Sequence, residues 1–502
     1  MIQEPPLKKF IHQSSHYLLG NISLMLSGFI SFPILTRVLS TQDYGLLSLI
    51  SITLWLSLAL TKAGLQEAAV RFYDEFESGK RKTTLSEFYT TLLFAAVIFA
   101  LLVAAGVAGI GFILFRETSY KNAHMLIWLL AGLIITSSLF LRLVNFLRAE
   151  QRSKMLNLIL ILRQYATLLL GILFLFTISK SITSYYSGIV LAEAGVVLFL
   201  LFQLYRNGHI HYKAFSIPFL KESLIFGIPL IGFEMANFLI KSVDRYLIQI
   251  FINLEAVAIY AAGSNLCQYL KDSVLYAVLY AITPIYIQLW NQEGAEKTRE
   301  FISKVIHYLF YLLVPITFGF IALGKPLVIL LASEKYQQSA SIIPIILPGI
   351  MLWGLSPLFA AGLYIQKKTK RLSVIVFAGV ILNGILNIIL IPRYHIAGAA
   401  WATLFSFVAL SIALIKLSHP YLKIHVKPAS FLRSVLASGL MFLLLKLIPL
   451  HGGALILLLK ILIGGGFYIL AILLVDQTLR KTLRTIFPLV KIRRLQTHSE
   501  KI

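Results

Sequence analysis

Long apolar stretches and short polar connections alternate along the whole chain. A hydrocarbon core about 30 Å thick requires roughly 20 apolar residues in a helix. Helices are favoured over a β-barrel because the stretches are continuously apolar, whereas barrel strands alternate over about 10 residues. The pattern predicts an all-α polytopic membrane protein. We predict about fourteen spans, at 14–36, 43–64, 84–115, 122–147, 155–179, 183–205, 220–243, 256–286, 302–323, 339–364, 372–391, 396–417, 430–449 and 453–475.

The first connection lies in FPILTRVLSTQDYGLLSLI, residues 32–50. Pro33 removes a backbone hydrogen bond and is expected to bend the first helix. Asp43 and Tyr44-Gly45 are expected to form a tight turn into the second helix. The segment 324–338 has the weakest pattern, and we expect a short re-entrant or interfacial piece there.

Composition supports the membrane interpretation. Hydrophobic residues make up 58% of the 502 positions and charged residues 13%, whereas an average soluble domain has about 25% charged residues. Such a chain cannot cover its surface with polar groups. Its single cysteine, Cys267, cannot form an internal disulfide and is expected to pack as a small apolar residue.

The basic residues indicate the topology. If the N-terminus is cytoplasmic, the inside segments carry roughly three times as many lysines and arginines as the outside ones. Both termini are therefore expected in the cytoplasm of a bacterial inner membrane. Most of the net charge of +24 then reflects topology, so no nucleic acid partner is expected, although the tail 478–495 can rest on anionic lipid. The opening MIQEPPLKKF shows no small-residue cleavage signal, so the first span is expected to be retained.

Several function classes are excluded by missing motifs. The chain has no phosphate-binding G-x-x-x-x-G-K-[ST] loop, no H-E-x-x-H and no G-x-S-x-G. The predicted outside connections are short for a membrane glycosyltransferase. We therefore expect a transporter and not an enzyme, with no metal or organic cofactor. Its energy can come from an ion gradient or the membrane potential.

An internal repeat is indicated by residues 226–265, which repeat the opening pattern. Pro229 corresponds to Pro33, and Arg245 corresponds to Arg37; a polar turn, a tyrosine and a nearby glycine follow in both segments. We infer two six-helix bundles and two appended helices. The predicted domains are 1–206, 207–428 including a cytoplasmic linker, and 429–502 with a basic cytoplasmic tail.

Three segments resemble one known family. PILTRVLSTQDYGLLSLI (33–50), AGLQEAAVRFYDEFESGKRK (63–82) and SVDRYLIQIFINLEAVAIYAAGSNL (242–266) are similar to the O-antigen and polysaccharide flippases of the Wzx type. That family belongs to the superfamily of multidrug, oligosaccharidyl-lipid and polysaccharide exporters. The resemblance implies that two bundles alternate access to move an undecaprenyl-pyrophosphate-linked oligosaccharide for O-antigen, capsule or exopolysaccharide synthesis. The implied partners are this lipid-linked substrate, membrane lipids, a polysaccharide polymerase and a chain-length regulator.

Charged residues within the predicted spans are the candidate site. An ionised side chain near the bilayer centre costs about 2.5–3.5 kcal/mol on insertion scales and is usually turned inward. Lys271, near the middle of the eighth span, is the strongest candidate for binding pyrophosphate. The competing interpretation is a structural pair with a carboxylate such as Glu234 or Asp244. The cations assigned to substrate binding are Lys271, Arg37, Arg163, Lys241, Arg245 and Lys62.

Some of these cations have simpler interpretations. Arg37 can extend to the outer headgroups from a helix end, and Lys62 with Glu67 can form an interfacial pair. Glu193 and Glu234 stand alone in apolar sequence, where proton coupling and a protonated core glutamate fit equally well. The acids assigned to ion coupling are Glu193, Glu234, Asp244, Asp272 and Glu67.

Three other functions compete with a polysaccharide flippase. A lipid II flippase of the peptidoglycan pathway also has fourteen spans and a basic cavity. A multidrug antiporter of the same superfamily would carry an acidic cation site in its first span, but residues 14–36 contain no Asp or Glu. A membrane scaffold would not require Lys271 at the midplane.

The predicted topology can be tested by thiol labelling. With Cys267 replaced by alanine, cysteines introduced at Ser119 and Ser333 should react with an impermeant reagent added to sealed cells. Cysteines at Ser78 and Ser303 should not react, because their connections are predicted to face the cytoplasm. Labelling at Ser78 from outside would reverse the orientation.

Overall fold

The computed structural model describes residues 26–79, 84–114, 122–424, 428–448, 453–476 and 480. The predicted start of the first span, the position Ser119 and most of the basic tail lie outside these ranges. The described residues form helices and connections without a β-strand, so the all-α prediction is confirmed. A helix satisfies its own backbone hydrogen bonds, which is what a chain of this hydropathy requires within lipid.

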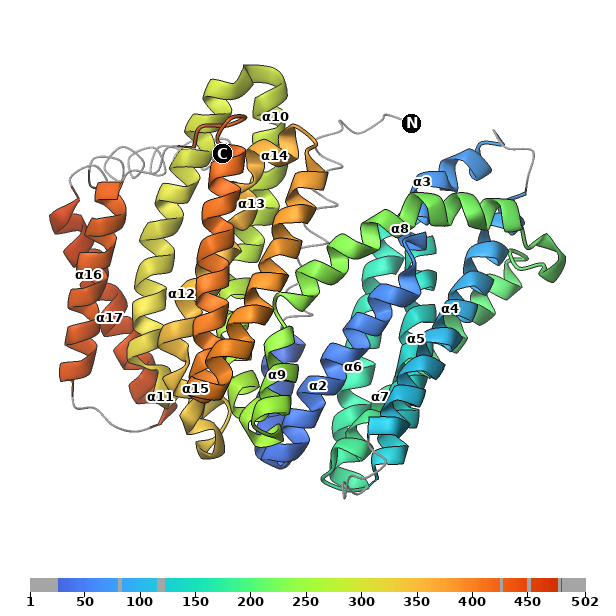
Figure 1. The fold of residues 1–502 in the computed structure, drawn as a ribbon, viewed down its shortest axis with the longest axis horizontal. Helices are drawn as coiled ribbons and strands as arrows, with labels where there is room; N and C mark the ends of the chain where they lie inside the picture. The colour runs from blue at the N-terminus through green and yellow to red at the C-terminus, as the bar shows by residue number, and fades with distance from the viewer. Residues whose placement is uncertain are drawn as a thin grey trace, which may run out of the picture. The chain divides into compact units, whose positions relative to one another are not determined.

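The chain divides into two compact units (Figure 1). Unit 1 comprises residues 1–265 and 373–403, and unit 2 comprises 266–372 and 404–502. The three domains predicted from the repeat pattern stay a prediction. The described helices that lie in unit 1 are Leu26–Val38, α2 (Thr41–Lys62), α3 (Leu65–Glu77), α4 (Leu85–Leu114), α5 (Ala123–Ala149), α6 (Ser153–Thr177), α7 (Ile182–Arg206), the 3₁₀ turn η1 (Tyr212–Ala214), α8 (Ile217–Leu239) and α9 (Val243–Phe251).

Two long helices contribute to both units. These are α10 (Leu254–Ala322) and α15 (Thr369–Ser418). The remaining elements lie in unit 2 and are α11 (Gly324–Leu331), the 3₁₀ helix η2 (Glu334–Ser341), α12 (Ile343–Gly354), α13 (Ser356–Phe359), α14 (Ala361–Ile365), α16 (Pro428–Leu447) and α17 (Ala454–Val475).

Within the described residues, nine helices are long and apolar enough to cross a membrane, and shorter apolar helices accompany them. The predicted number of fourteen stays a prediction. Two of the long helices each cover two predicted spans, and each consists of two helical segments that meet at a kink within the expected connection. Non-helical backbone interrupts α10 at Gly294 and α15 at His395, and both residues have positive φ, of 82° and 51°. The uncertain segment 324–338 forms the eight-residue α11 and part of η2.

The opening motif folds differently from the prediction. The first described helix ends at Val38, and Ser40 caps α2 by accepting a hydrogen bond from the backbone N–H of Asp43 at 3.0 Å. Asp43 and Gly45 are thus in α2 and not in a turn. Gly45 instead lies against the backbone of Leu254, where an added Cβ would overlap the carbonyl oxygen. A glycine is needed at position 45 because the two helices approach so closely that only a small residue fits.

The break between α2 and α3 creates a second close approach. Ala63 and Gly64 both adopt left-handed backbone conformations, with φ of 46° and 67°. The backbone of Gly64 packs directly on the backbone of Gly227 in α8, and no Cβ fits on either residue. Beyond the break, α3 buries one face against an aromatic cluster that includes Phe72, Phe88 and Phe219. Unit 1 is therefore closely packed around the break between α2 and α3.

The last two described helices are attached to α10 by polar contacts. In unit 2, α16 and α17 pack on each other (Figure 1). Asp476, which is fully buried, accepts hydrogen bonds from Tyr311 of α10 and, at 3.2 Å, from Arg433 of α16. Tyr468 of α17 donates to the backbone oxygen of Tyr311 at 2.9 Å. Burying these polar groups stabilises the arrangement because each one finds a partner. Elsewhere in the unit, Cys267 is buried, as predicted.

Candidate substrate and coupling site

An arginine and a glutamate from neighbouring helices form the most buried ion pair described. Arg163 of α6 donates to Glu193 of α7 through Nε, at 2.7 Å, and through a terminal amino group. The Glu193 side chain is 0% exposed and that of Arg163 is 28% exposed. The two helices pack closely because Gly188 of α7 lies on the backbone of Leu170. Both residues were predicted for the site, but in different roles.

The neighbouring α5 completes the environment of this pair. Ser137 Oγ donates to the second carboxylate oxygen of Glu193 at 2.8 Å, and Thr136 does so at 3.3 Å. The Arg163 guanidinium lies over the ring of Phe140, 4.5 Å from its centre. The carboxylate of Glu193 thus receives hydrogen bonds from one cation and two hydroxyl groups, so all of its partners come from the surrounding helices.

A second ion pair joins two further predicted residues. Lys62, the last residue of α2, binds Glu234 of α8. The contact between Gly64 and Gly227 brings these helices together. The Lys62 side chain is largely buried, whereas 45% of Glu234 is exposed. The predicted interfacial pair of Lys62 with Glu67 is wrong, because Glu234 is the carboxylate that Lys62 binds.

Arg245 of α9 is bound by neutral groups. Its terminal amino groups donate to Ser48 of α2 at 2.8 Å and to Asn265 and Ser264 of α10 at 2.8 and 3.2 Å. Asn265 also donates to the hydroxyl of Tyr44, at 3.3 Å. Neutral partners fix the orientation of a guanidinium without cancelling its charge.

Asp244 precedes Arg245 and is buried. One carboxylate oxygen accepts the backbone N–H of Arg245 at 2.8 Å, and the other accepts the hydroxyl of Tyr260. The Tyr260 hydroxyl also lies 3.4 Å from that of Thr403. The arrangement ties α9 to α10 within unit 1. A role of Asp244 in ion coupling stays a prediction.

Lys271 lies on α10 in unit 2. Its ammonium binds Asp272 at 2.8 Å and donates to Gln268 at 3.0 Å. Its aliphatic stem crosses Gly354 of α12, where an added Cβ would lie 3.1 Å from Cγ of the lysine. The side chain is 13% exposed, whereas that of Asp272 is 47% exposed.

Within their own units, Lys271 and its predicted partners Glu234 and Asp244 have other contacts, and a pairing of Lys271 with either acid stays a prediction. Glu234 binds Lys62, and Asp244 binds Tyr260 and the backbone of Arg245. Adjacent residues such as Lys271 and Asp272 point about 100° apart around a helix. The long lysine side chain overcomes this separation by bending towards the next carboxylate.

The other predicted residues lie apart from these contacts. Arg37 and Lys241 are exposed, and Arg37 donates to the carbonyl of Pro33 in its own helix at 3.0 Å. Glu67 of α3 acts electrostatically on Arg142 of α5. Arg142 is only 3% exposed, and its Nε and one terminal nitrogen make no hydrogen bond within the described residues. Its position inside the predicted span 122–147 was a signal for this burial.

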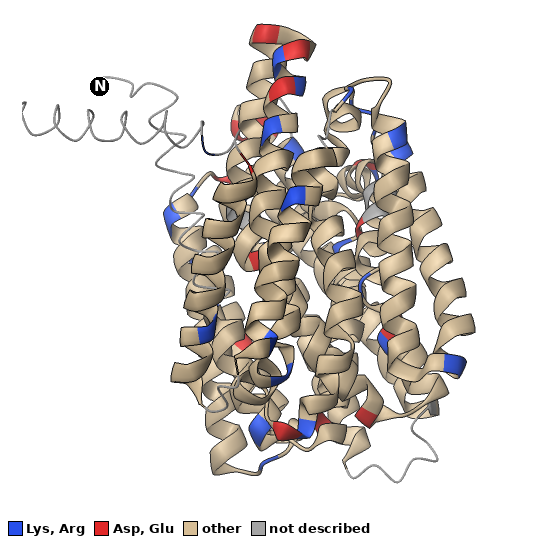
Figure 2. Cartoon of the chain, turned by 90° about the vertical axis from the view of Figure 1, so that its left-hand side faces the viewer, with Lys and Arg blue, Asp and Glu red and all other residues tan. Residues whose placement is uncertain are grey.

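Charged residues elsewhere collect towards helix ends, with a few inside otherwise uncharged helices (Figure 2). Sequence reasoning found most of the charged residues within the helices but missed their neutral partners. Ser48, Ser137 and Asn265 are common residue types in membrane helices, and nothing in the local pattern distinguishes them.

The ion pair between Arg163 and Glu193 can be tested by paired substitutions. Arg163→Met or Glu193→Leu alone should destabilise the protein by about 3–5 kcal/mol, because each leaves a desolvated charge without its partner. Combining the two should restore most of the lost stability. The measurement is the thermal unfolding midpoint of the purified protein in detergent.

Ser137→Ala provides the matched control, since it removes one neutral donor from the same carboxylate and should cost about 1 kcal/mol. If the double variant loses as much stability as the sum of the single variants, the two side chains are not an energetic pair.

Solved structures show the same fold. The lipid II flippase MurJ in its inward closed conformation is 16% identical, with a TM-score of 0.72, over 92% of this chain and 98% of that one. A multidrug resistance MATE family transporter of the MOP superfamily, in an inward-facing conformation, is 16% identical with a TM-score of 0.58, over 81% and 94% of the two chains. An outward-facing structure of such a transporter gives 14% identity and a TM-score of 0.55, over 83% and 96%.

Sequence comparisons identify the family. An uncharacterized membrane protein of Methanocaldococcus jannaschii is 25% identical over 255 residues, which is 47% of each protein. The chain thus spans about half the length of this curated relative. A family model described as polysaccharide biosynthesis protein matches residues 11–290, more than half of the chain. With the all-α fold and the charged contacts within its helices, this match shows that the chain belongs to the polysaccharide biosynthesis protein family.

Proposed function

We propose that the protein is a flippase that moves an undecaprenyl-pyrophosphate-linked oligosaccharide from the inner to the outer leaflet of a bacterial cytoplasmic membrane. Family membership supports a role in polysaccharide synthesis, and the fold shared with MurJ and MATE transporters supports transport. The proposed topology has both termini in the cytoplasm. A polymerase and a chain-length regulator would then receive the translocated product.

The observation that carries this proposal is the pairing of Lys271 with Asp272, a carboxylate that is 47% exposed and is therefore not enclosed by other helices of its unit. We infer that Lys271 can exchange this partner for a ligand. A pyrophosphate carries more negative charge and can replace Asp272 at little cost. The contact between Lys62 and the half-exposed Glu234 has the same property. We assign Lys271 and Lys62 to phosphate binding on this ground.

Arg163 and Arg245 take supporting roles in the proposal. Releasing Arg163 would leave a fully buried Glu193 without its cation, which is costly. The guanidinium of Arg245 is held by neutral donors and acceptors beside α2, and the buried Asp244 next to it offsets part of its charge. Fixed and exchangeable cations together would attract the anionic substrate and still allow its release.

A lipid II flippase is the alternative favoured by a specific observation, the likeness to MurJ over 92% of this chain. A multidrug antiporter is less favoured, because the described helix Leu26–Val38 carries no carboxylate for a cationic drug. The choice between lipid-linked substrates depends on the sugar, which contacts groups other than these cations.

The function can be tested by deletion of the gene and by reconstitution. The deletion strain should accumulate a pyrophosphate-linked sugar repeat on the inner leaflet, and the isolated sugar identifies the pathway. In proteoliposomes, the purified protein should make this lipid accessible to an external sugar-binding reagent. Accumulation of the peptidoglycan precursor alone would favour the alternative function.

Lys271 provides a sharp prediction at the residue level. Lys271→Ala should abolish surface polysaccharide while protein level and membrane insertion stay normal, because the ammonium that binds pyrophosphate is lost. Lys271→Arg should retain part of the activity, since the positive charge persists. Asp272→Asn is the matched control and should retain transport.

A purely structural role of Lys271 predicts a different set of results. Lys271→Ala would then lower the amount of folded protein, and adding Asp272→Asn would restore it. Normal export in Lys271→Ala, or recovery of export in that double variant, would contradict phosphate binding.

Coupling to a proton gradient can be tested at the two paired glutamates. Glu234→Gln should leave insertion normal and remove the response of transport to a pH gradient, because the amide does not titrate. Glu193→Gln should do the same but with lower stability, since Arg163 loses a buried partner. Retention of the pH-gradient response in both variants would exclude these residues from coupling.

A further inference from the structure

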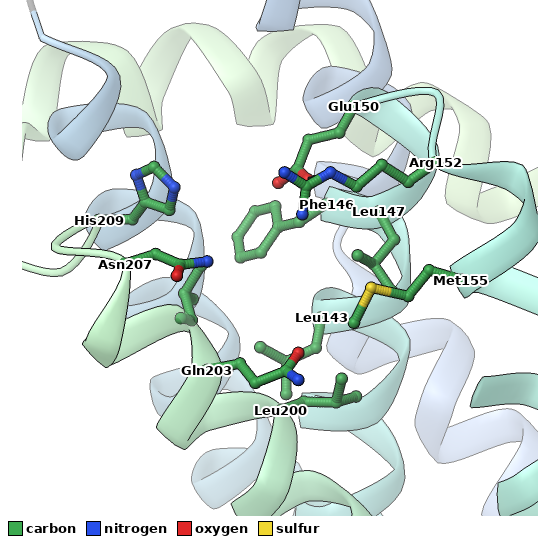
Figure 3. Close-up of a pocket in the computed structure, with 11 residues that line it drawn as sticks. Leu143, Phe146, Leu147, Glu150, Arg152, Met155, Leu200, Gln203, Asn207 and His209 are labelled. Atoms are coloured by element: carbon green, nitrogen blue, oxygen red, sulfur yellow. Dashed lines mark ion pairs between the residues drawn. The ribbon is translucent and has the colours of Figure 1, made fainter. Parts of the chain in front are cut away.

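A small pocket lies in unit 1 where α5 ends, α6 begins and α7 ends (Figure 3). Its volume is about 40 Å³, enough for one small polar group or a few water molecules. The floor is apolar and includes Leu143, Leu147, Met155 and Leu200. None of the residues predicted for substrate binding or coupling lines this pocket.

An arginine with unused donors stands at one side of the pocket (Figure 3). Arg152 binds Glu150 through Nε at 3.0 Å, and its side chain is 55% exposed while that of Glu150 is 12% exposed. Glu150 also accepts the hydroxyl of Tyr89 at 2.5 Å. The carboxylate is thus satisfied and fixes the orientation of Arg152, while four N–H groups of the guanidinium remain available to a ligand.

The opposite side carries further donors. The ring of His209 stacks on Tyr89 with 4.7 Å between ring centres, and its backbone oxygen accepts the hydroxyl of Ser86 at 3.2 Å. These contacts hold the histidine beside the pocket. The side-chain nitrogens of His209, Asn207 and Gln203 make no hydrogen bond among the described parts of the chain, and all three residues line the pocket.

Two features of the surroundings favour a lipid headgroup, namely exposed tyrosines and exposed arginines. Tyr205 and Tyr212 are 72% and 77% exposed, as is typical of rings at the headgroup level. The exposed cations Arg148 and Arg206 lie on the neighbouring helix ends.

We propose that this pocket binds the phosphate of an anionic phospholipid. Arg152, His209 and Asn207 would donate to the phosphate oxygens, as basic sites between membrane helices do for lipid headgroups. The apolar floor would contact the glycerol and the first acyl carbons, which a free phosphate lacks. A lipid held there would join the ends of α5, α6 and α7 to the linker that follows α7.

The test uses the full chain in nanodiscs of phosphatidylcholine with increasing amounts of phosphatidylglycerol. Phosphatidylglycerol should raise the thermal unfolding midpoint of the native protein. Arg152→Gln and His209→Ala should each weaken the apparent affinity for phosphatidylglycerol by about tenfold or more, as expected for loss of a charge-assisted hydrogen bond. Arg148→Gln is the matched control, because it removes an exposed arginine outside the pocket and should leave the response intact.

Two further measurements separate the lipid from its phosphate. Inorganic phosphate added to the same nanodiscs should not reproduce the stabilisation, and Met155→Trp, which narrows the floor without changing charge, should weaken it. An equal effect of inorganic phosphate would contradict a lipid site. A response to phosphatidylglycerol that is the same in Arg152→Gln, Met155→Trp and the native protein would contradict the pocket itself.

Discussion

Charges enclosed by apolar helices must be neutralised within a few ångströms, and the described parts of this protein are organised by that requirement. Water is scarce inside such a bundle, so most of the buried ions described bind a counter-ion or a set of hydroxyl and amide groups, with Arg142 as an exception. Arg163 meets Glu193, Lys62 meets Glu234 and Lys271 meets Asp272. The first two pairs join different helices and therefore also fix how those helices pack. The same contacts thus neutralise the charges and hold the helices together.

The ion pairs have similar contact distances, but they differ in how far the carboxylate is exposed. A partner that water reaches can be exchanged for a ligand, whereas a partner sealed among helices is effectively part of the scaffold. Glu193 belongs to the second kind, and Asp272 and Glu234 belong to the first. Arg245 represents a third solution, in which Ser48 and Asn265 hold the guanidinium without neutralising it. A protein of this fold can thus contain some cations whose partners are fixed and others whose partners can be exchanged for a ligand.

The fold class was predictable because continuous apolar stretches of this length have few other solutions, and isolated charges in such stretches are conspicuous. The partners were not predictable, because Lys62 and Glu234 are 172 positions apart and only the tertiary packing joins them. Local rules also failed in two places. Gly45 resembled a turn residue but serves a close backbone contact, and Asp272 lies next to Lys271 in sequence yet pairs with it because the lysine side chain is long.

The buried Asp476 imposes an order on how the chain is completed during synthesis. Its partners Arg433 and Tyr311 lie 43 and 165 positions earlier, so they enter the membrane before their acid has been made. Until residue 476 emerges from the ribosome, the guanidinium of Arg433 lacks this carboxylate and α17 lacks its polar attachment at that end. The pair of helices α16 and α17 can therefore reach its final docked state only late in the synthesis of the chain.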